Sequence, residues 1–168
     1  NFNKEEWSSI KVNFSKKLSK VNAVILSDYG KGTLLDVPML IKMAKRKKIN
    51  VFIDPKGDDF NKYKGAYAIT PNFIEFSNVV GKVDNEKDLN NKANELIKKL
   101  SLNVLLITRG QEGMTLFEKN RGKAVRTDFP TEAKDVFDVS GAGDTVIASL
   151  ASGLASGLAL GDSVRLAN

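Results

Sequence analysis

The segment from Asp138 to Thr145 holds the residues of this chain whose types and spacing are best suited to chemistry. It reads Asp-Val-Ser-Gly-Ala-Gly-Asp-Thr, so that two carboxylates flank a Gly-Ala-Gly turn. Gly141 and Gly143 can adopt backbone angles that are closed to other residues, and they let a ligand approach the main chain. Asp144 can accept a proton from a hydroxyl group as that hydroxyl attacks phosphorus. The segment therefore favours phosphoryl transfer to a hydroxyl.

An apolar run directly behind this turn predicts the helix that would position it. Its apolar residues recur at spacings of three, four and seven and share one helical face. They are Val146, Ile147, Leu150, Ala151, Leu154 and Ala155. The first turn of a helix offers free N–H groups and the positive end of the helix dipole, which stabilise a phosphate. The alternative is that Asp and Ser only cap the helix and that the glycines only allow close packing.

The rest of the chain alternates short apolar strands with amphipathic helices. Strands are predicted over 23–27, 50–54, 66–70 and 104–108, and a hairpin over 114–118 and 123–127. Helices are predicted over 5–20, 72–80 and 84–100, around 37–44 with Asp36 as the N-cap, and from 161 onward. This alternation indicates βαβ units and a parallel sheet with right-handed crossovers. Ligands bind at the carboxyl ends of such strands. The segments at Asp28, Asp54, Asn72 and Arg109 each follow a predicted strand, so we expect one site at that edge.

The Asp138–Asp144 segment resembles the signature of the ribokinase-like (PfkB) carbohydrate kinases, Asp-x-x-Gly-Ala-Gly-Asp, with Ser140 where Thr is expected. Segments 26–32, 53–57, 70–76 and 108–114 are similar, in the same order, to the branch of that family that acts on D-glycero-β-D-manno-heptose 7-phosphate. The resemblance implies an α/β fold of three layers, α/β/α, with a mostly parallel central sheet that is incomplete at both ends. Residues 1–168 would form the ATP-binding core of the kinase domain, without its N-terminal sugar-binding and lid portion and its C-terminal end.

The resemblance also implies a reaction, the ATP-dependent phosphorylation of the anomeric hydroxyl of the heptose 7-phosphate to the 1,7-bisphosphate. This step belongs to ADP-heptose and lipopolysaccharide core synthesis. Asp144 would assist deprotonation of the hydroxyl, and the amides of Gly141, Ala142 and Gly143 would stabilise charge on the transferred group. Two alternatives stay open: a nucleotide-binding segment with no activity of its own, and another sugar kinase of the same family.

The residues that the resemblance assigns to ATP come from two further segments. They are Asn72, Phe73, Ile74, Glu75, Thr108 and Gly110. Asn72 and Glu75 match the family's Asn-x-x-Glu motif, which organises the ATP phosphates and Mg²⁺. Glu75 would hold the cation through water, because Mg²⁺ keeps several of its waters. The same two residues are spaced as a capping box, and the two roles are compatible. The Thr108–Gly110 segment can also be read as an ordinary turn between strands.

Three loop segments supply weaker candidates. Lys56 can reach a phosphate as a point charge, and a solvated loop lysine is the alternative. Asp28, Tyr29 and Lys31 could face the sugar phosphate or the ATP phosphates.

Composition excludes several other kinds of site. The 168 residues include 42% hydrophobic and 27% charged residues, which suits one globular domain or part of one. The chain has no Cys and no His, which excludes disulfides, thiol nucleophiles, Ser-His-Asp triads and His-zinc sites within it. The P-loop pattern is also absent.

Charge and hydropathy bear on partners and location. A net charge of +6 favours anionic ligands such as nucleotides and sugar phosphates. Nucleic acid is the competing interpretation, but basic clusters such as residues 45–48 are typical of helix C-terminal ends. There is no run of about 18 apolar residues and no signal peptide, so we expect a cytoplasmic protein without membrane or nucleic-acid partners. The family resemblance implies a homodimer for the full-length protein.

Overall fold

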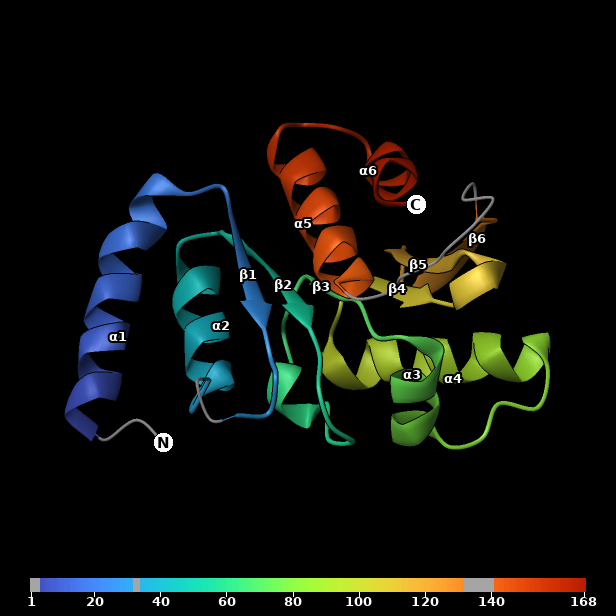
Figure 1. Cartoon of the computed structure of the whole chain (residues 1–168), viewed down its shortest axis with the longest axis horizontal. Coiled ribbons are helices and arrows are strands. Elements are labelled where there is room, and N and C mark those ends of the chain that lie inside the picture. The colour runs from blue at the N-terminus through green and yellow to red at the C-terminus, as the bar shows by residue number, and fades with distance from the viewer. Residues whose placement is uncertain (1–3, 32–33, 132–140) are drawn as a thin grey trace.

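A central six-stranded sheet lies between two layers of helices (Figure 1). The computed structural model describes residues 4–31, 34–131 and 141–168. The strands are β1 (Ala23–Ser27), β2 (Asn50–Asp54), β3 (Ala68–Ile69), β4 (Val104–Thr108), β5 (Met114–Asn120) and β6 (Lys123–Phe129). They lie side by side in sequence order; β1 to β4 are parallel, and β5 and β6 are antiparallel. This confirms the expected three-layer α/β/α fold with a mostly parallel sheet.

The helices divide between the two faces of the sheet (Figure 1). They are α1 (Lys4–Lys17), α2 (Val37–Arg46), α3 (Phe73–Val80), α4 (Glu86–Leu100), α5 (Ala142–Ala155) and α6 (Leu160–Ala167). The described part of the chain also contains three short 3₁₀ turns, η1 (Leu18–Lys20), η2 (Asn61–Tyr63) and η3 (Gly110–Glu112). Helices α1 to α4 cover one face, and α5 and α6 cover the other.

The central strands β2, β3 and β4 are buried on both faces, which is why they read as apolar runs rather than alternating ones. In β2, Ile53 packs into the core beneath α1 to α4, whereas its neighbour Phe52 packs beneath α5 and α6. Leu105 and Leu106 divide in the same way in β4. Each such fully buried side chain contributes about 1.5–3 kcal/mol of hydrophobic free energy, before conformational entropy is counted.

Side-chain caps fix where the helices begin. Asp36 accepts a hydrogen bond from the Met39 N–H at 3.0 Å, which confirms it as the N-cap of α2. Asn72 caps α3 in a complete capping box with Glu75. Helix α3 ends at Gly81, whose φ of 84° lies in the left-handed region that glycine tolerates best.

Some boundaries differ from the sequence-based expectations. The predicted strand over 66–70 pairs as a strand only at Ala68–Ile69, the two residues that are in register with both β2 and β4. The predicted helix over 84–100 begins at Glu86 because Asn85 caps it. The first helix ends at Lys17 and tightens into a 3₁₀ turn. Within the described residues, no helix is both long enough and apolar enough to cross a bilayer.

Candidate functional site

A cleft of about 900 Å³ opens at the edge of the sheet where the parallel strands end. β1 ends at Ser27, β2 at Asp54 and β4 at Thr108, so the residues that follow these strands converge there. The cleft has three walls: the first turn of α5, the first turn of α3, and the segment that joins β4 to β5. A cavity therefore lies at the edge where the sequence predicted a single site, and its role in binding stays a prediction.

In the wall from α5, accessible backbone of the Gly-Ala-Gly turn lies beside the Asp144 carboxylate. Gly141 precedes the helix with a φ of 80°, and as a glycine N-cap it has no side chain of its own to cap the helix. A Cβ atom added at Gly141 or Gly143 would meet none of the described residues within 4 Å, so these residues leave room for a ligand to approach both glycines closely. Gly141, Ala142, Gly143 and Asp144 all line the cleft. Amides in the first turn of a 14-residue helix lack intrahelical partners and attract anions. The predicted Asp138 and Ser140 lie outside the described residues.

Two hydroxyl groups approach the Asp144 carboxylate. The Tyr29 hydroxyl donates to Asp144 Oδ2 at 2.9 Å, and this hydrogen bond raises the pKa of Tyr29. The Ser27 hydroxyl lies 3.3 Å from Asp144 Oδ1 and 3.4 Å from Asp54 Oδ2, and it can donate its single proton to one of them at a time. A carboxylate has about four lone-pair sites, so Asp144 keeps the capacity to accept a proton from a further hydroxyl.

A second carboxylate in the cleft is Asp54, which the sequence placed at this edge without a role. Burial raises its pKa to about 6, and the negative charges of Glu75 and Asp144 add to that effect. The signal available in the sequence was its position at the end of a buried strand, shared with Asn72 and Asp28. Thr70, Gln111, Thr131 and Asn168 also line the cleft and were not singled out.

The wall from α3 is held by the capping box. The Glu75 N–H donates to Asn72 Oδ1 at 2.8 Å, and Glu75 Oε2 accepts from the Asn72 N–H at 3.1 Å. The other carboxylate oxygen of Glu75 pairs with Lys56 Nζ at 2.9 Å, which raises the pKa of Lys56. The capping role of Asn72 and Glu75 is confirmed; their role toward a nucleotide stays a prediction. In the described part of the chain, no three acidic side chains lie close enough to form a metal site by themselves.

The third wall, from Thr108 to Gly113, is attached to α3 and to the hairpin. The Thr108 N–H donates to the Pro71 carbonyl at 3.1 Å, and Thr108 forms an isolated parallel bridge with Asn72. Both Thr108 and Gly110 line the cleft. Arg109 between them turns away: its guanidinium lies 5.6 Å from the centre of the Phe73 ring.

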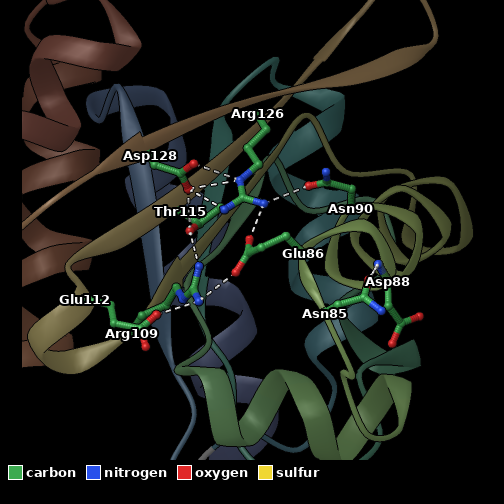
Figure 2. A network of polar contacts seen from close by, with 9 residues as sticks. All are labelled: Asn85, Glu86, Asp88, Asn90, Arg109, Glu112, Thr115, Arg126 and Asp128. Carbon is green, nitrogen blue, oxygen red and sulfur yellow. Dashed lines mark hydrogen bonds and ion pairs between the residues drawn. The ribbon is translucent and has the colours of Figure 1, made fainter.

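Figure 2 shows the polar network that holds Arg109 in that position. Glu86, at the start of α4, pairs with Arg109 at 3.2 Å and also with Arg126 of β6. Arg126 Nε donates to Asp128 at 3.0 Å, and Asp128 accepts from the Thr115 hydroxyl at 2.8 Å. The hydrogen bond from Arg126 lowers the pKa of Glu86 against the opposing effect of partial burial, and the bond from Arg109 adds to it. The network thus joins the third wall to α4 and to both strands of the hairpin.

Five predicted residues do not line the cleft. Lys56 only approaches it through Glu75. Phe73 is partly buried beneath Arg109, Ile74 is 71% exposed, and Lys31 is exposed. The Asp28 carboxylate is buried and accepts hydrogen bonds from Lys62 and Tyr63 instead. Although burial opposes it, this pairing lowers the pKa of Asp28. The ligand roles proposed for these residues stay predictions.

The sequence profile of the pfkB family carbohydrate kinases matches residues 3–168. Among curated proteins, the bifunctional protein HldE of Vibrio cholerae is 51% identical over 151 residues, which cover 90% of this chain and 31% of that protein. HldE of Haemophilus influenzae is 45% identical over 167 residues, 99% of this chain and 34% of that protein. The chain thus spans about a third of the length of these relatives.

Solved structures share the fold at low sequence identity. Arabidopsis thaliana ribokinase complexed with ribose and ATP superposes with a TM-score of 0.78 at 21% identity, over 92% of this chain and 50% of that one. Escherichia coli phosphofructokinase-2 in complex with substrates and products gives 0.79 at 16% identity, over 99% of this chain and 54% of that one.

Proposed function

The chain belongs to the pfkB family of carbohydrate kinases, and from this premise we propose that it binds ATP in the cleft and transfers the γ-phosphoryl group to the anomeric hydroxyl of D-glycero-β-D-manno-heptose 7-phosphate. One observation carries the transfer chemistry: the Asp144 carboxylate stands in the cleft beside the open main chain of Gly141 to Gly143. The choice of sugar rests on the sequence segments that resemble the heptose 7-phosphate branch, above all 26–32 and 53–57.

In the proposed reaction, Asp144 accepts the proton of the sugar hydroxyl as that hydroxyl attacks phosphorus. A positioned base of this kind contributes roughly 10²- to 10⁴-fold to the rate. Tyr29 and Ser27 restrict the orientation of the carboxylate before the substrate arrives. The first-turn amides of α5 then donate to the oxygens of the transferred group. Because they are already fixed by the helix, they need no reorganisation during the reaction.

The opposite walls would hold the nucleotide. Asn72, Glu75, Thr108 and Gly110 line the side of the cleft that faces α5, and we assign the ATP phosphates to the space between. The site suits Mg²⁺, because Asp54 and Glu75 both line the cleft. Burial raises the pKa of Asp54, and the negative charge of Glu75 adds to that effect, which a cation would offset. Two carboxylates suffice for a cation that takes its other ligands from water and phosphate. When bound, Mg²⁺ would neutralise charge on the β- and γ-phosphates.

The proposal is tested by titrating Mg·ATP calorimetrically into the chain and into Asp144→Asn, followed by a kinase assay with heptose 7-phosphate. Asp162→Asn is the matched control, because Asp162 also lies in the first turn of a helix but pairs with Arg165 outside the cleft. We expect both variants to bind Mg·ATP like the parent chain. Turnover should fall by at least about a hundredfold only in Asp144→Asn.

The other outcomes separate the alternatives. Mg·ATP binding without turnover in the parent chain would indicate a nucleotide-binding segment that needs the remainder of a longer protein. Turnover with a different sugar, but not with heptose 7-phosphate, would indicate another kinase of the family. Absence of Mg·ATP binding would contradict the assignment of the cleft to the nucleotide.

A further inference from the structure

A buried tyrosine outside the cleft, Tyr63, joins two loops that lead into the site. Its ring is fully buried in η2. Its hydroxyl lies 2.7 Å from Asp28 Oδ2, to which it donates, and it accepts from the Lys56 N–H at 3.0 Å. The carbonyl of Lys56, at 3.3 Å, is the more distant acceptor. We call the phenol of Tyr63, the carboxylate of Asp28 and the N–H of Lys56 the Tyr63 junction.

The junction is held on its other side as well. Asp28 Oδ1 accepts from the Gly30 N–H at 2.8 Å, which folds the 28–30 loop back on itself. Lys62 Nζ donates to Asp28 Oδ2 at 2.7 Å. Bonds to an ionised, buried carboxylate are stronger than bonds between neutral groups. The phenol oxygen of Tyr63 therefore joins the two loops beyond the strand ends, where the Asp28 N–H already donates to the Asp54 carbonyl at 3.0 Å.

Each of these loops carries the side chain that contacts one carboxylate of the cleft. Tyr29 follows Asp28 and donates to Asp144 at 2.9 Å, and the Lys56 ammonium group pairs with Glu75 at 2.9 Å. Neither side chain is confined by burial, because Tyr29 is 58% exposed and the Lys56 side chain is 56% exposed. Their reach toward Asp144 and Glu75 thus depends on where the two loop backbones are held.

We propose that Tyr63 is a positioning residue, which fixes the 28–30 and 55–57 loops so that Tyr29 meets Asp144 and Lys56 meets Glu75. The inference rests on the proposed function in assigning Asp144 and Glu75 to the reaction. A merely structural tyrosine would affect only the free energy of unfolding. A positioning tyrosine also changes contacts in a cleft that it does not touch.

The test uses Tyr63→Phe, which removes only the hydroxyl, and Tyr67→Phe as the matched control. Tyr67 is the third tyrosine of the chain; it packs against Phe52, outside both the junction and the cleft lining. Two measurements need no kinase activity. Amide hydrogen exchange at Lys56 should accelerate about tenfold in Tyr63→Phe, because its acceptor is lost, and should not change in Tyr67→Phe. The ¹³Cζ resonance of Tyr29 should move toward its position in Asp144→Asn, where the Tyr29–Asp144 bond is altered directly.

A kinetic measurement then tests the consequence for the reaction. In the full-length kinase we expect Tyr63→Phe to lower kcat roughly threefold to tenfold, and Tyr67→Phe to leave it unchanged. In a background that already carries Tyr29→Phe and Lys56→Met, the further loss from Tyr63→Phe should disappear, since the two side chains it positions are gone.

The outcomes separate the two proposals. An unchanged Lys56 exchange rate and an unchanged Tyr29 resonance in Tyr63→Phe would overturn the positioning role. An undiminished effect on kcat in the Tyr29→Phe, Lys56→Met background would overturn it as well. Loss of all kinase activity in the parent protein would contradict the proposed function instead, while the exchange and resonance measurements would still decide the role of Tyr63.

Discussion

At the residue scale, the cleft gathers carboxylates whose charges oppose one another. The effect is seen at Asp54: burial and the charges of Glu75 and Asp144 raise its pKa to about 6 from an ordinary value of 3.8. The hydrogen bond from Ser27 and the charge of Lys56 act in the opposite direction but do not cancel the shift. Asp54 is therefore a group whose ionisation opposes folding of the ligand-free chain.

Because ionised Asp54 destabilises the folded chain, we expect Asp54→Asn to stabilise the chain in a pH-dependent way. Near pH 4 and below, Asp54 is largely protonated in the folded chain, and its ionisation costs little. Between about pH 4 and 6 the unfolded chain releases a proton that the folded chain retains, so stability falls as pH rises. After allowance for solvent screening, we expect Asp54→Asn to raise the free energy of unfolding by about 1–2 kcal/mol at pH 8 and by almost nothing at pH 4.

Urea unfolding of both proteins without Mg²⁺ or nucleotide, at each pH, measures this difference. Asp162→Asn again serves as the control, because Asp162 forms an exposed pair with Arg165 and does not line the cleft. A gain from Asp54→Asn that was equal at both pH values would point to packing rather than to charge.

The sequence predicted where site residues gather, but it did not predict the direction of each side chain. Strand ends in a parallel sheet meet at one edge, so the segments at Asp28, Asp54, Asn72 and Arg109 could be grouped from their positions alone. Asp28 and Tyr29 are neighbours in the sequence, yet Asp28 turns inward and Tyr29 lines the cleft. That difference depends on Tyr63, 35 residues from Asp28, and no local pattern reports such a contact.

At the element scale, Gly113 forms the turn between η3 and the start of β5, where the chain packs closely against the end of β6. Its φ is 82°, and a Cβ atom there would lie 2.0 Å from the Phe129 carbonyl oxygen and 2.6 Å from the Thr131 nitrogen. Both obstacles are backbone atoms at the end of β6, so they cannot rotate away. We expect Gly113→Ala to lower the free energy of unfolding by at least about 3 kcal/mol.

Gly122 in the hairpin turn is the matched control for that change. Its φ is 88°, but a Cβ atom there would lie more than 4 Å from every other residue that the structure describes. Gly122→Ala should therefore cost only the backbone strain, about 1–2 kcal/mol. Thermal and urea unfolding of the two variants give the comparison. Equal losses would show that the approach of Gly113 to the end of β6 adds nothing to the strain of its backbone.

The network in Figure 2 predicts that Arg126 stabilises the hairpin against α4. Its side chain is 20% exposed and pairs with Glu86 and Asp128. Arg126→Met keeps the apolar stem but leaves those carboxylates without this partner, so we expect a loss of about 1–2 kcal/mol in unfolding free energy. Arg165→Met removes a far more exposed pair and should change stability by less than about 0.5 kcal/mol. Similar losses in both would contradict the importance of partial burial.

The helices and long strands could be predicted because apolar periodicity and capping residues are local. Asp36, the Asn72–Glu75 capping box and Gly81 appear in the structure where their patterns indicated. The length of β3 could not be predicted, because its two paired residues depend on contacts with β2 and β4 rather than on its own sequence. The network around Glu86 could not be predicted either, since it joins residues from α4, from the segment between β4 and η3, and from both strands of the hairpin.

At the scale of the whole molecule, charge acts in two opposite senses. The net charge of +6 attracts anionic ligands over long distances, and this attraction weakens as salt is added. Within the cleft, however, Asp54, Glu75 and Asp144 oppose a polyphosphate at short range. A divalent cation bound together with the nucleotide would remove this repulsion, because it places positive charge between the phosphates and the carboxylates of the cleft.

ATP affinity should therefore depend strongly on Mg²⁺. We expect chelation of the metal to weaken ATP binding at least about tenfold at about 0.15 M salt, where long-range attraction is largely screened. Glu75→Gln should reduce that dependence because it removes one of the opposing carboxylates. Glu95→Gln, an exposed change on α4 away from the cleft lining, should preserve it. Calorimetric titration of the three proteins with and without Mg²⁺ makes the comparison. If ATP bound equally well without the metal, the carboxylates would not face the phosphates, and the assignment of Mg²⁺ to Glu75 would be wrong.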